Sequence, residues 1–450
     1  MRRPSDGVRG EYAPRGPRWA LAARLALYNL LLALCSPLLG VWLLWRGVVR
    51  GKGLGCFRHR LGLVPRLPQG GGPRVWLHAV SAGEMSAAGP VLEALLRELP
   101  EARVVVSTVT PAGMTMAEKT CGRAHALFYL PFDGPGCMMR ALRRVRPDLV
   151  VVAEKEMWPN FLGLAVLMGA RVQAVNGRVS DRMVSRARWA PGFVRWLYRL
   201  PDLLCVQSEQ DARRLVEIGV PATRILVAGN TKADNLAERD AESEARLAGD
   251  LGLEGPGIWL VAGSTHPGEE EIILEAFLAI RKEIPEVRLL LAPRHLDRVA
   301  SVSAAVAERG ISAVRRSEAT GSAGEGVVIL DTMGELRAAY AFGTAGFVGG
   351  TLVPIGGHNL LEPVAAGRAV LFGPHTENCS DVSDLVREWQ VGFQVQGAGE
   401  LAEEFLRIAR DPERQRRIAS KGRELIVAQR GAAQRCADAA RALLGLERHP

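Results

Sequence analysis

Apolar and polar positions alternate in blocks along the chain after residue 73. Short runs rich in valine and leucine recur in the first half, at 74–80, 103–108, 149–154, 171–176 and 203–208. Such runs are typical of parallel strands that are buried on both faces. The segments between them, such as 86–99 and 136–146, have helical character, so the pattern predicts a doubly wound α/β domain.

A second series of the same kind begins after the pattern restarts near 225–235. Its apolar runs lie at 257–264, 287–294, 326–332, 345–350 and 368–374. The clearest amphipathic helix, 269–284, falls between the first two runs. We therefore expect two Rossmann-like domains with a cleft between them, over 51–225 and 226–450. In such domains, ligands bind beyond the carboxyl ends of the strands.

The first 50 residues differ from both series. The 21 residues from Leu25 to Trp45 carry no charge, and as a helix they would span about 31 Å, close to one hydrocarbon core. We expect residues 1–50 to form a basic N-terminus with a retained membrane anchor. A cleaved signal peptide and a buried or in-plane helix are the alternatives, and Asn29 and Pro37 weaken a strictly spanning interpretation. Basic residues on both sides leave the orientation undecided.

Charge and composition narrow the classes of partner. Much of the net charge of +9 lies near the N-terminus, which places the basic excess beside a membrane. Aromatic residues make up only 6%, and we expect no nucleic-acid partner. The seven cysteines form no C-x-x-C pair and the eight histidines no H-E-x-x-H motif, which indicates reduced thiols in a cytosolic domain and no metal site.

Three further stretches stand out by their composition. A Pro/Gly-rich stretch at 65–73 is typical of a loop, and the role of the arginine-rich first 18 residues stays open. The arginine-rich stretch near 178–195 is compatible with contact to an anionic lipid acceptor, or with a solvated basic helix.

A carboxylate follows the first apolar run, where Ser81-Ala82-Gly83-Glu84 turns into a helix. Its simplest interpretation is a first-turn acid that complements the helix dipole. Its place at the carboxyl end of a strand also suits a group that does chemistry, and one turn is compatible with both roles. Two more strand ends carry charge, at Glu154 in EKEMWPN (154–160) and at Arg178 in NGRVSDR (176–182). A plain charged loop is the alternative for EKEMWPN.

In the second half, Ser264, Thr265 and His266 form a turn between a strand and a helix. Backbone N–H groups and hydroxyls at a helix N-terminus suit an anion. Ordinary capping explains the same residues, with Glu269 and Glu270 offsetting the helix dipole.

Two later segments also point to an anionic or nucleotide ligand. Arg294 and His295 follow a strand and suit a phosphate or carboxylate, although a solvated turn is the alternative. In the stretch 348–374, adjacent glycines allow close backbone approach to a ligand, Asn359 is positioned to cap a helix, and Glu362 is suited to accept hydrogen bonds from ribose hydroxyls. Capping alone does not explain this whole array, which favours a binding role.

Taken in order, these motifs resemble the 3-deoxy-D-manno-octulosonic acid (Kdo) transferases that decorate lipid A. The matching segments are HAVSAGE, YLPFD (129–133), EKEMWPN, NGRVS, GNTK (229–232), GSTHPGEE, APRH, DTMGEL and GGHNLLEP. Each is weak alone, but the ordered series covers most of the chain beyond residue 50. Two small departures leave the polar residues intact: the family usually has valine at Ala82 and alanine at Gly177.

The resemblance implies an inverting GT-B glycosyltransferase that needs neither a metal nor a cofactor. Its N-terminal domain takes the acceptor, a lipid A precursor of the lipid IVA type, and its C-terminal domain takes the donor, CMP-Kdo. Such an enzyme works at the inner membrane, with its catalytic domains on the cytoplasmic face.

The motifs also carry over residue roles. Glu84 matches the proposed general base, which deprotonates the acceptor hydroxyl. Glu154 would shape the sugar site and Arg178 would meet the Kdo carboxylate. The expected donor-binding residues are Lys232, Ser264, Thr265, His266, Arg294, His295, Met333, Gly334, Glu335, Gly357, His358, Asn359 and Glu362.

Two other functions fit parts of the pattern. A soluble UDP-sugar epimerase or transferase would share the two domains and the glycine-rich loop, but it would not need the apolar N-terminal segment or the HAVSAGE turn. A membrane-tethered nucleotide-binding adaptor would not need carboxylates and basic groups at strand ends in both halves.

Overall fold

The computed structural model describes residues 17–50, 56–67, 70–179, 183–185, 189, 191–235, 241–252, 257–319 and 326–446, without the side chains of 35–50 and 235. The arginine-rich N-terminus, the loop 65–73 and the basic stretch near 178–195 lie wholly or partly outside the described residues. Contacts divide the chain into two compact units. The first holds residues up to Asn235 and those from Gln429 onward, and the second holds Leu236–Ala428.

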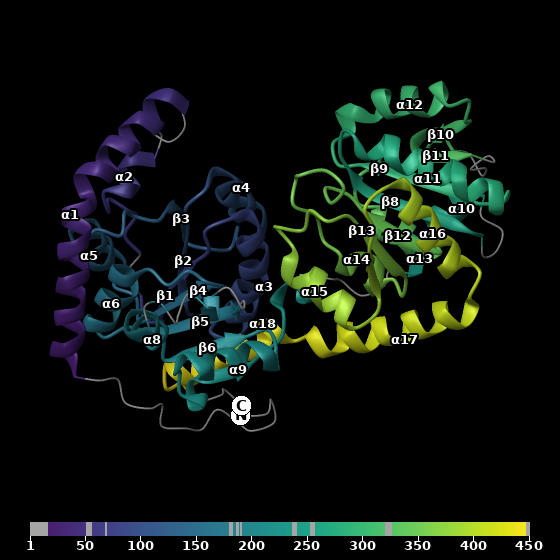
Figure 1. Ribbon diagram of the computed structural model, residues 1–450. Coiled ribbons are helices and arrows are strands. Elements are labelled where there is room, and N and C mark those ends of the chain that lie inside the picture. Colours follow the sequence, from purple (N-terminus) through teal and green to yellow (C-terminus); the bar gives the residue numbers. More distant parts are fainter. Residues whose placement is uncertain are drawn as a thin grey trace. The chain divides into compact units, whose positions relative to one another are not determined.

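A parallel sheet forms the centre of the first unit (Figure 1). Within the described residues it has seven strands in the order β3-β2-β1-β4-β5-β6-β7. The strands are β1 (Arg74–His78), β2 (Arg103–Thr108), β3 (Ala126–Tyr129), β4 (Leu149–Ala153), β5 (Arg171–Gly177), β6 (Leu203–Val206) and β7 (Ile225–Val227). The helices of this unit are α1 (Arg18–Arg50), α2 (Phe57–Arg60), α3 (Ala82–Glu98), α4 (Pro111–Thr120), α5 (Pro135–Val145), α6 (Pro159–Leu167), α8 (Pro191–Tyr198), α9 (Glu209–Ile218), α18 (Ala432–Leu443) and the 3-10 turns η2 (Ala222–Arg224) and η3 (Thr231–Asn235).

Helices cover both faces of this sheet, which explains why its strands are apolar without alternation. Along β4, Val150 belongs to a core that includes residues of α1, α5 and α6. The next residue, Val151, belongs to a second core with residues of α3 and α18. Each strand therefore buries successive side chains on opposite faces, as the continuous valine runs predict.

The second unit repeats the same design. Within the described residues its parallel sheet has seven strands in the order β10-β11-β9-β8-β12-β13-β14. The strands are β8 (Trp259–Thr265), β9 (Arg288–Pro293), β10 (Ala313–Arg315), β11 (Val327–Ile329), β12 (Ala345–Val348), β13 (Ala369–Phe372) and β14 (Gly392–Gln394). The helices are α10 (Ala241–Asp250), α11 (Glu269–Glu283), α12 (Val299–Glu308), α13 (Leu336–Phe342), α14 (Leu361–Ala365), α15 (Ser380–Glu388), α16 (Ala398–Ala409), α17 (Pro412–Gln429) and the 3-10 turns η4 (Leu296–Arg298) and η5 (Arg316–Glu318).

Both sheets reverse their strand order at one place. In the first sheet the reversal falls between β1 and β4, and in the second between β8 and β12. Connections leave the two flanking strands in opposite directions there, which opens space for a ligand beyond their carboxyl ends. The segments that follow these four strands contain HAVSAGE, EKEMWPN, GSTHPGEE and the glycine-rich loop. The predicted pair of doubly wound domains is therefore confirmed.

The division into units differs from the predicted boundary at 225/226. Residues 226–235 and the C-terminal segment from Gln429 belong to the first unit. The side chain of Asp234 accepts hydrogen bonds from the backbone N–H groups of Gly431 and Ala433, both at 2.6 Å, which holds the start of α18. An amphipathic helix shows in the sequence which of its faces is buried, but not which sheet it packs on.

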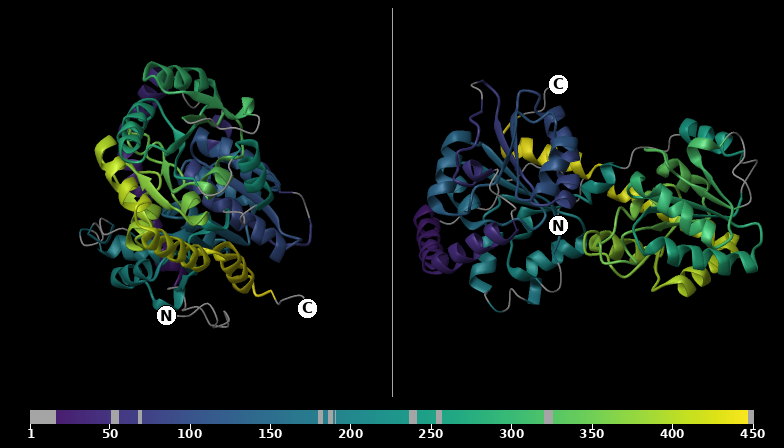
Figure 2. Two further views of the ribbon diagram at one scale, coloured as in Figure 1. Left: turned by 90° about the vertical axis from the view of Figure 1, so that its right-hand side faces the viewer. Right: turned by 90° about the horizontal axis from the view of Figure 1, so that it is seen from above.

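The N-terminal helix α1 includes the whole predicted apolar segment and lies against α6 in the first unit (Figure 2). Among the described residues, no helix combines the length and the apolar character needed to cross a bilayer.

Candidate active site

Glu84 lies in the first turn of α3 and takes part in capping this helix. Ser81 is the N-cap of this helix, and its Oγ accepts a hydrogen bond from the Glu84 N–H at 3.3 Å. Glu84 Oε2 in turn accepts a hydrogen bond from the Val80 N–H at 2.7 Å, so the turn is a variant of the capping box. Glu84 Oε1 has no hydrogen-bond donor among the residues that the structure describes. The turn thus fixes the carboxylate and leaves one oxygen available.

Burial raises the pKa of the Glu84 carboxyl, and the negative charge of Glu154 raises it further, while the hydrogen bonds from Val80 and Ser81 oppose the shift. A carboxylate with a raised pKa is a stronger base than an exposed one, as proton abstraction from a hydroxyl requires.

Glu154 lies beside Glu84, directly after β4. Its backbone has a φ of +54°, which is strained for a residue with a side chain, and such strain is concentrated at functional sites. Its Oε1 lies 3.1 Å from Lys232 Nζ and accepts a hydrogen bond from Asn176 Nδ2 at 3.3 Å. Lys232, predicted as a donor-binding residue, therefore belongs to the first unit and pairs with Glu154.

Glu156 is a third carboxylate of this group, and the sequence analysis did not single it out. Burial raises the pKa of Glu156 to about 7, and the charges of Glu84 and Glu154 contribute. Its Oε2 accepts a hydrogen bond from Trp158 Nε1 at 2.8 Å. The only sequence signal was a second acid two residues after Glu154. We call Glu84, Glu154 and Glu156 the acidic cluster.

The neighbouring strand end carries Asn176 and Arg178. Asn176 also has a positive φ, +54°, and its Oδ1 accepts a hydrogen bond from the Thr231 N–H at 3.0 Å. This contact joins the end of β5 to the GNTK segment and so to Lys232. Arg178 follows β5 at the same sheet edge and is partly buried. Asn176 and Thr231 were not predicted as site residues, although both lie in the quoted motifs.

Three histidines gather at the corresponding edge of the second sheet. His266 Nε2 lies 2.8 Å from His358 Nε2, and the His266 and His295 rings are 5.9 Å apart. We call these three residues the histidine cluster. Burial, followed by the positive charge of Arg294, lowers the pKa of His358 to about 4, and burial also lowers the pKa of His266. The two imidazoles are therefore neutral at pH 7, one donating to the other, and Arg294 supplies the positive charge.

Glu269 holds the loop that carries part of this cluster. Its side chain is fully buried and accepts backbone hydrogen bonds from four residues. These are His266 (3.0 Å), Gly350 (2.7 Å), Thr351 (3.0 Å) and Leu352 (2.9 Å). The prediction that Glu269 merely offsets the helix dipole is therefore incomplete: it ties the turn after β8 to the turn after β12.

Two residues of the GSTHPGEE motif are used inside the fold. Thr265 is fully buried, and its hydroxyl donates to Glu270 Oε1 at 2.8 Å. Arg298 Nη1 donates to the same oxygen at 2.7 Å, so Glu270 also has a structural role. The Thr265 hydroxyl is therefore used in a buried hydrogen bond within the fold. Ser264, with a φ of +56°, and His266 remain partly exposed.

The remaining predicted donor residues lie on two segments of the second unit. Asn359 Oδ1 accepts a hydrogen bond from the Leu361 N–H at 3.2 Å, close to the predicted capping. Burial raises the pKa of Glu362, which accepts from Asn359 Nδ2 at 3.4 Å. Gly357 has a φ of +84°, and a Cβ there would lie 2.6 Å from Cys379 Sγ, so only glycine fits. On the second segment, Met333 is 75% exposed, Gly334 has a positive φ, and Glu335 pairs with Arg316 at 3.0 Å.

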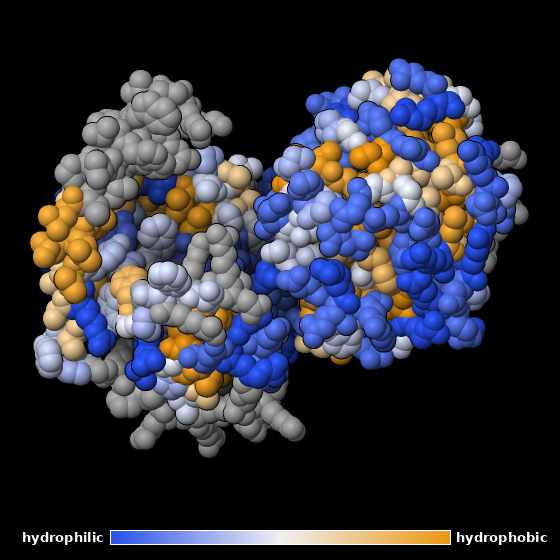
Figure 3. Space-filling view, in the orientation of Figure 1, coloured by the Kyte–Doolittle hydropathy of each residue, from blue (hydrophilic) through white to orange (hydrophobic). Residues whose placement is uncertain are grey.

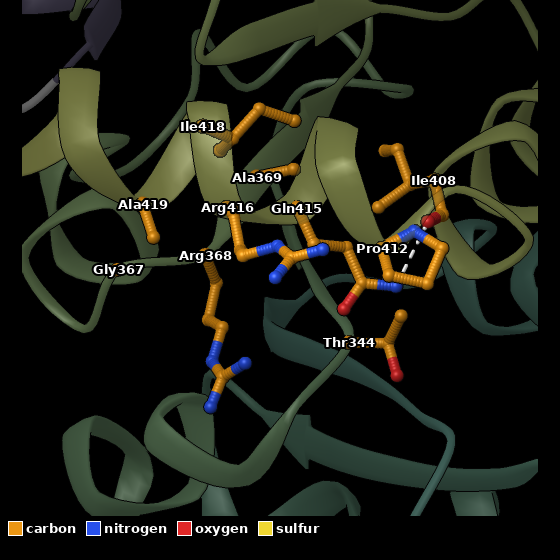
Figure 4. A pocket seen from close by; sticks show the side chains of 10 residues that line it. All are labelled: Thr344, Gly367, Arg368, Ala369, Ile408, Pro412, Gln415, Arg416, Ile418 and Ala419. Carbon is orange, nitrogen blue, oxygen red and sulfur yellow. Dashed lines mark hydrogen bonds between the residues drawn. The ribbon is translucent and has the colours of Figure 1, made fainter.

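A cavity of about 450 Å³ lies elsewhere in the second unit (Figure 4). Thr344 and Arg368 line it, and they precede β12 and β13, so it opens at the amino ends of the strands. None of the predicted donor-binding residues lines it. Among the residues that the structure describes, no cluster of metal-ligating side chains suited to hold a metal ion occurs.

Comparison with known proteins finds a matching family model and similar proteins of the same kind. Residues 56–235 match the family model described as 3-deoxy-D-manno-octulosonic-acid transferase (kdotransferase). The 3-deoxy-D-manno-octulosonic acid transferase of Haemophilus influenzae is 30% identical over 91% of this chain and 96% of its own length. The enzyme of the same name from Bordetella pertussis is 32% identical over 93% of this chain and 99% of its own length.

Solved structures show the same architecture. A UDP-N-acetylglucosamine 2-epimerase is similar with a TM-score of 0.54 at 14% identity, over 86% of this chain and 98% of that one. At this identity the likeness establishes the two-domain fold alone. The C-terminal CMP-Kdo binding domain of WaaA from Acinetobacter baumannii is 28% identical over 41% of this chain and 96% of that domain, with a TM-score of 0.39.

Proposed function

Because the chain belongs to the family of Kdo transferases, which are glycosyltransferases of lipopolysaccharide synthesis, we propose that it moves Kdo from CMP-Kdo to a lipid A precursor of the lipid IVA type. The acidic cluster would receive the acceptor hydroxyl. The second unit would bind the donor at the edge of its sheet that carries the histidine cluster.

The open oxygen of Glu84 is the observation that carries this proposal. Oε2 is engaged by the Val80 N–H, so Oε1 is directed by the turn rather than by a mobile side chain. In the proposed reaction, the acceptor hydroxyl gives its proton to Oε1 as its oxygen attacks the anomeric carbon of Kdo. The bond from that carbon to the CMP phosphate breaks on the opposite face, which inverts the configuration.

The leaving CMP needs hydrogen-bond donors and positive charge on its phosphate. Arg294 and the neutral imidazoles of the histidine cluster are the proposed partners. Asn359 and Glu362 are proposed to bind the ribose, and the segment around Gly334 the cytosine. In the first unit, Arg178 is proposed to meet the Kdo carboxylate.

We also propose that the enzyme works on the cytoplasmic face of the inner membrane and that α1 attaches it there. Five large apolar side chains of α1 are each more than half exposed: Trp19 (74%), Leu27 (59%), Leu30 (58%), Leu31 (54%) and Leu34 (69%). Figure 3 shows an apolar patch at the left edge of the view, where α1 lies in Figure 1. With Arg24 exposed on the same helix, this face has the chemistry of a helix lying in an anionic lipid surface.

A transfer assay tests the proposed function. The full chain is incubated with CMP-Kdo and a tetraacylated lipid A precursor, and the masses of the products are measured by mass spectrometry. We expect a mass increase of one or more Kdo units and release of CMP. If CMP-Kdo is not consumed, the assignment of the donor is refuted. If Glu84→Ala transfers Kdo at the parental rate, the assignment of Glu84 as the base is refuted.

A further inference from the structure

The inner face of α1 docks closely on the first unit. Helix α1, drawn in purple, runs along one side of the first unit (Figures 1 and 2) and packs against α6. Leu25 is only 3% exposed and rests on Gly163 of α6. A Cβ on Gly163 would lie 2.8 Å from Leu25 Cδ2, so this glycine permits the approach of the two helices. On the same face of α1, one turn further along, stand Tyr28 and Asn29.

Asn29 and Asn160 form a reciprocal amide pair. Asn29 Nδ2 donates to Asn160 Oδ1 at 2.9 Å, and Asn160 Nδ2 donates to Asn29 Oδ1 at 2.7 Å. Asn160 is fully buried, at the second residue of α6. Two directional hydrogen bonds in a buried setting fix the relative position of α1 and the start of α6.

The start of α6 depends on a residue from a different segment. The N-cap residue, Trp158, provides no side-chain cap, and the first N–H groups of a helix have no partner within it. Asp133 supplies the acceptors: Oδ2 takes the Asn160 N–H at 3.1 Å and Oδ1 takes the Phe161 N–H at 2.8 Å. Tyr28 of α1 donates its hydroxyl to Asp133 Oδ2 at 3.2 Å. Asp133 and Asn160 are the polar ends of the YLPFD and EKEMWPN motifs, and neither has a role in the proposed chemistry.

The residues that immediately precede α6, Glu154–Trp158, carry two of the three acidic side chains. We call them the acidic loop. We propose that α1 is a positioning element of the acceptor site: Tyr28 and Asn29 hold the start of α6 and thereby the acidic loop. This inference rests on the proposed function of the acidic cluster. It gives the two faces of α1 separate tasks, lipid contact outside and support of the acceptor site inside.

Kinetics with a detergent-dispersed acceptor test the inference, because attachment to vesicles does not then limit the rate. Asn29→Ala removes both hydrogen bonds of the pair, and Met168→Ala, exposed at the C-terminal end of α6, is the matched control. We expect Asn29→Ala to lower kcat about tenfold with the KM for CMP-Kdo unchanged, and Met168→Ala to behave as the parent. In the Asn160→Ala background, Asn29→Ala should cause no further loss, since the contact is already gone.

A second readout does not depend on activity. Hydrogen exchange of the amides from Glu156 to Phe161 should be faster in Asn29→Ala than in Met168→Ala. If Asn29→Ala does not fold, Tyr28→Phe, which removes one hydroxyl, is measured in its place. We then expect a smaller fall in kcat and a smaller rise in the exchange rates.

The inference is overturned if Asn29→Ala keeps the parental kcat and exchange rates, or if the two asparagine variants lower kcat independently. Glu84→Gln in the same assay separates the two hypotheses. Parental activity of Glu84→Gln refutes the base assignment, whereas an inactive Glu84→Gln beside a fully active Asn29→Ala refutes the role of α1 alone.

Discussion

The two sheets have the same design and opposite chemistry at their carboxyl ends. Where the first sheet reverses its strand order, three carboxylates gather, and burial and mutual repulsion raise the pKa of Glu84 and of Glu156. Where the second sheet reverses, three histidines gather beside Arg294, and two of them have lowered pKa values. The fold thus selects the position of each site, and the side chains after the strands decide whether it is suited to accept a proton or to bind an anion.

The support of the two sites differs as well. In the second unit, one buried carboxylate, Glu269, joins the two turns on either side of the strand reversal. In the first unit, contacts among Asn176, Thr231 and Glu154 hold the strand ends, and Asp133 holds the helix after the acidic loop. A donor that must leave as an anion needs fixed N–H groups, whereas a base needs a carboxylate with an open oxygen.

Removing the base is expected to have the largest effect. Glu84→Gln keeps the shape and the hydrogen bond from Val80 but cannot accept a proton, so the rate of transfer should fall about a hundredfold to ten-thousandfold. Product formation followed by mass spectrometry measures it. Glu93→Gln, on the same helix, is the control and should transfer as the parent does. A Glu84→Gln enzyme within about threefold of the parental rate would assign the proton transfer elsewhere.

Replacing the buried carboxylate of Glu269, which joins two turns of the second unit, should have the next largest effect. In Glu269→Gln, an NH₂ group faces backbone N–H groups, and some of them lose their acceptor while buried, which should destabilise the unit by about 2–4 kcal/mol. Calorimetric unfolding measures this loss. Glu271→Gln, on the exposed face of α11, should unfold as the parent does. Equal stability of the two variants would mean that Glu269 only complements the helix dipole.

Removing the positive charge beside the histidine cluster should weaken donor binding. Arg294→Ala is expected to raise the KM for CMP-Kdo about ten- to hundredfold, because a charged hydrogen bond to phosphate is lost. Initial rates over a range of donor concentrations measure it, with Arg309→Ala at the end of α12 as the control. A parental KM would place the phosphate away from Arg294.

The smallest expected effect is a shift in pH dependence. The raised pKa of Glu84 means that activity is present above that pKa and is lost as the pH falls through it. Glu154→Gln removes the negative charge that raises the pKa of Glu84, so the acidic limb of kcat/KM should move to lower pH by about half a unit to one unit. Glu156, Lys155 and Lys232 remain in place, so the other titratable groups around Glu84 are unchanged. An acidic limb that stays in place or moves to higher pH would show that the two carboxylates do not titrate together.

The sequence predicted the long central strands well because they are continuous apolar runs. It missed β3, β10 and β14, which have only four, three and three residues and lie at or near sheet edges. In β10 and β14 exposed side chains interrupt the apolar pattern, whereas β3 is apolar but only four residues long.

The candidate site was predictable where a motif follows a strand, as for Glu84, Glu154 and Arg294. The partners of Glu269 were not, because Gly350 and Thr351 stand about eighty residues away along the chain. The structural roles of Asp133 and Asn160 were hidden for the same reason. A motif shows that a residue matters in the family, but only the fold shows what it contacts.

Titration of the enzyme with CMP by calorimetry tests the division of tasks between the two sites most directly. The parent, Glu84→Gln and Arg294→Ala are compared under one set of conditions. The account predicts that Glu84→Gln binds CMP with parental affinity although it does not transfer Kdo, and that Arg294→Ala binds CMP more weakly. Loss of CMP binding in Glu84→Gln, with parental binding in Arg294→Ala, would contradict it.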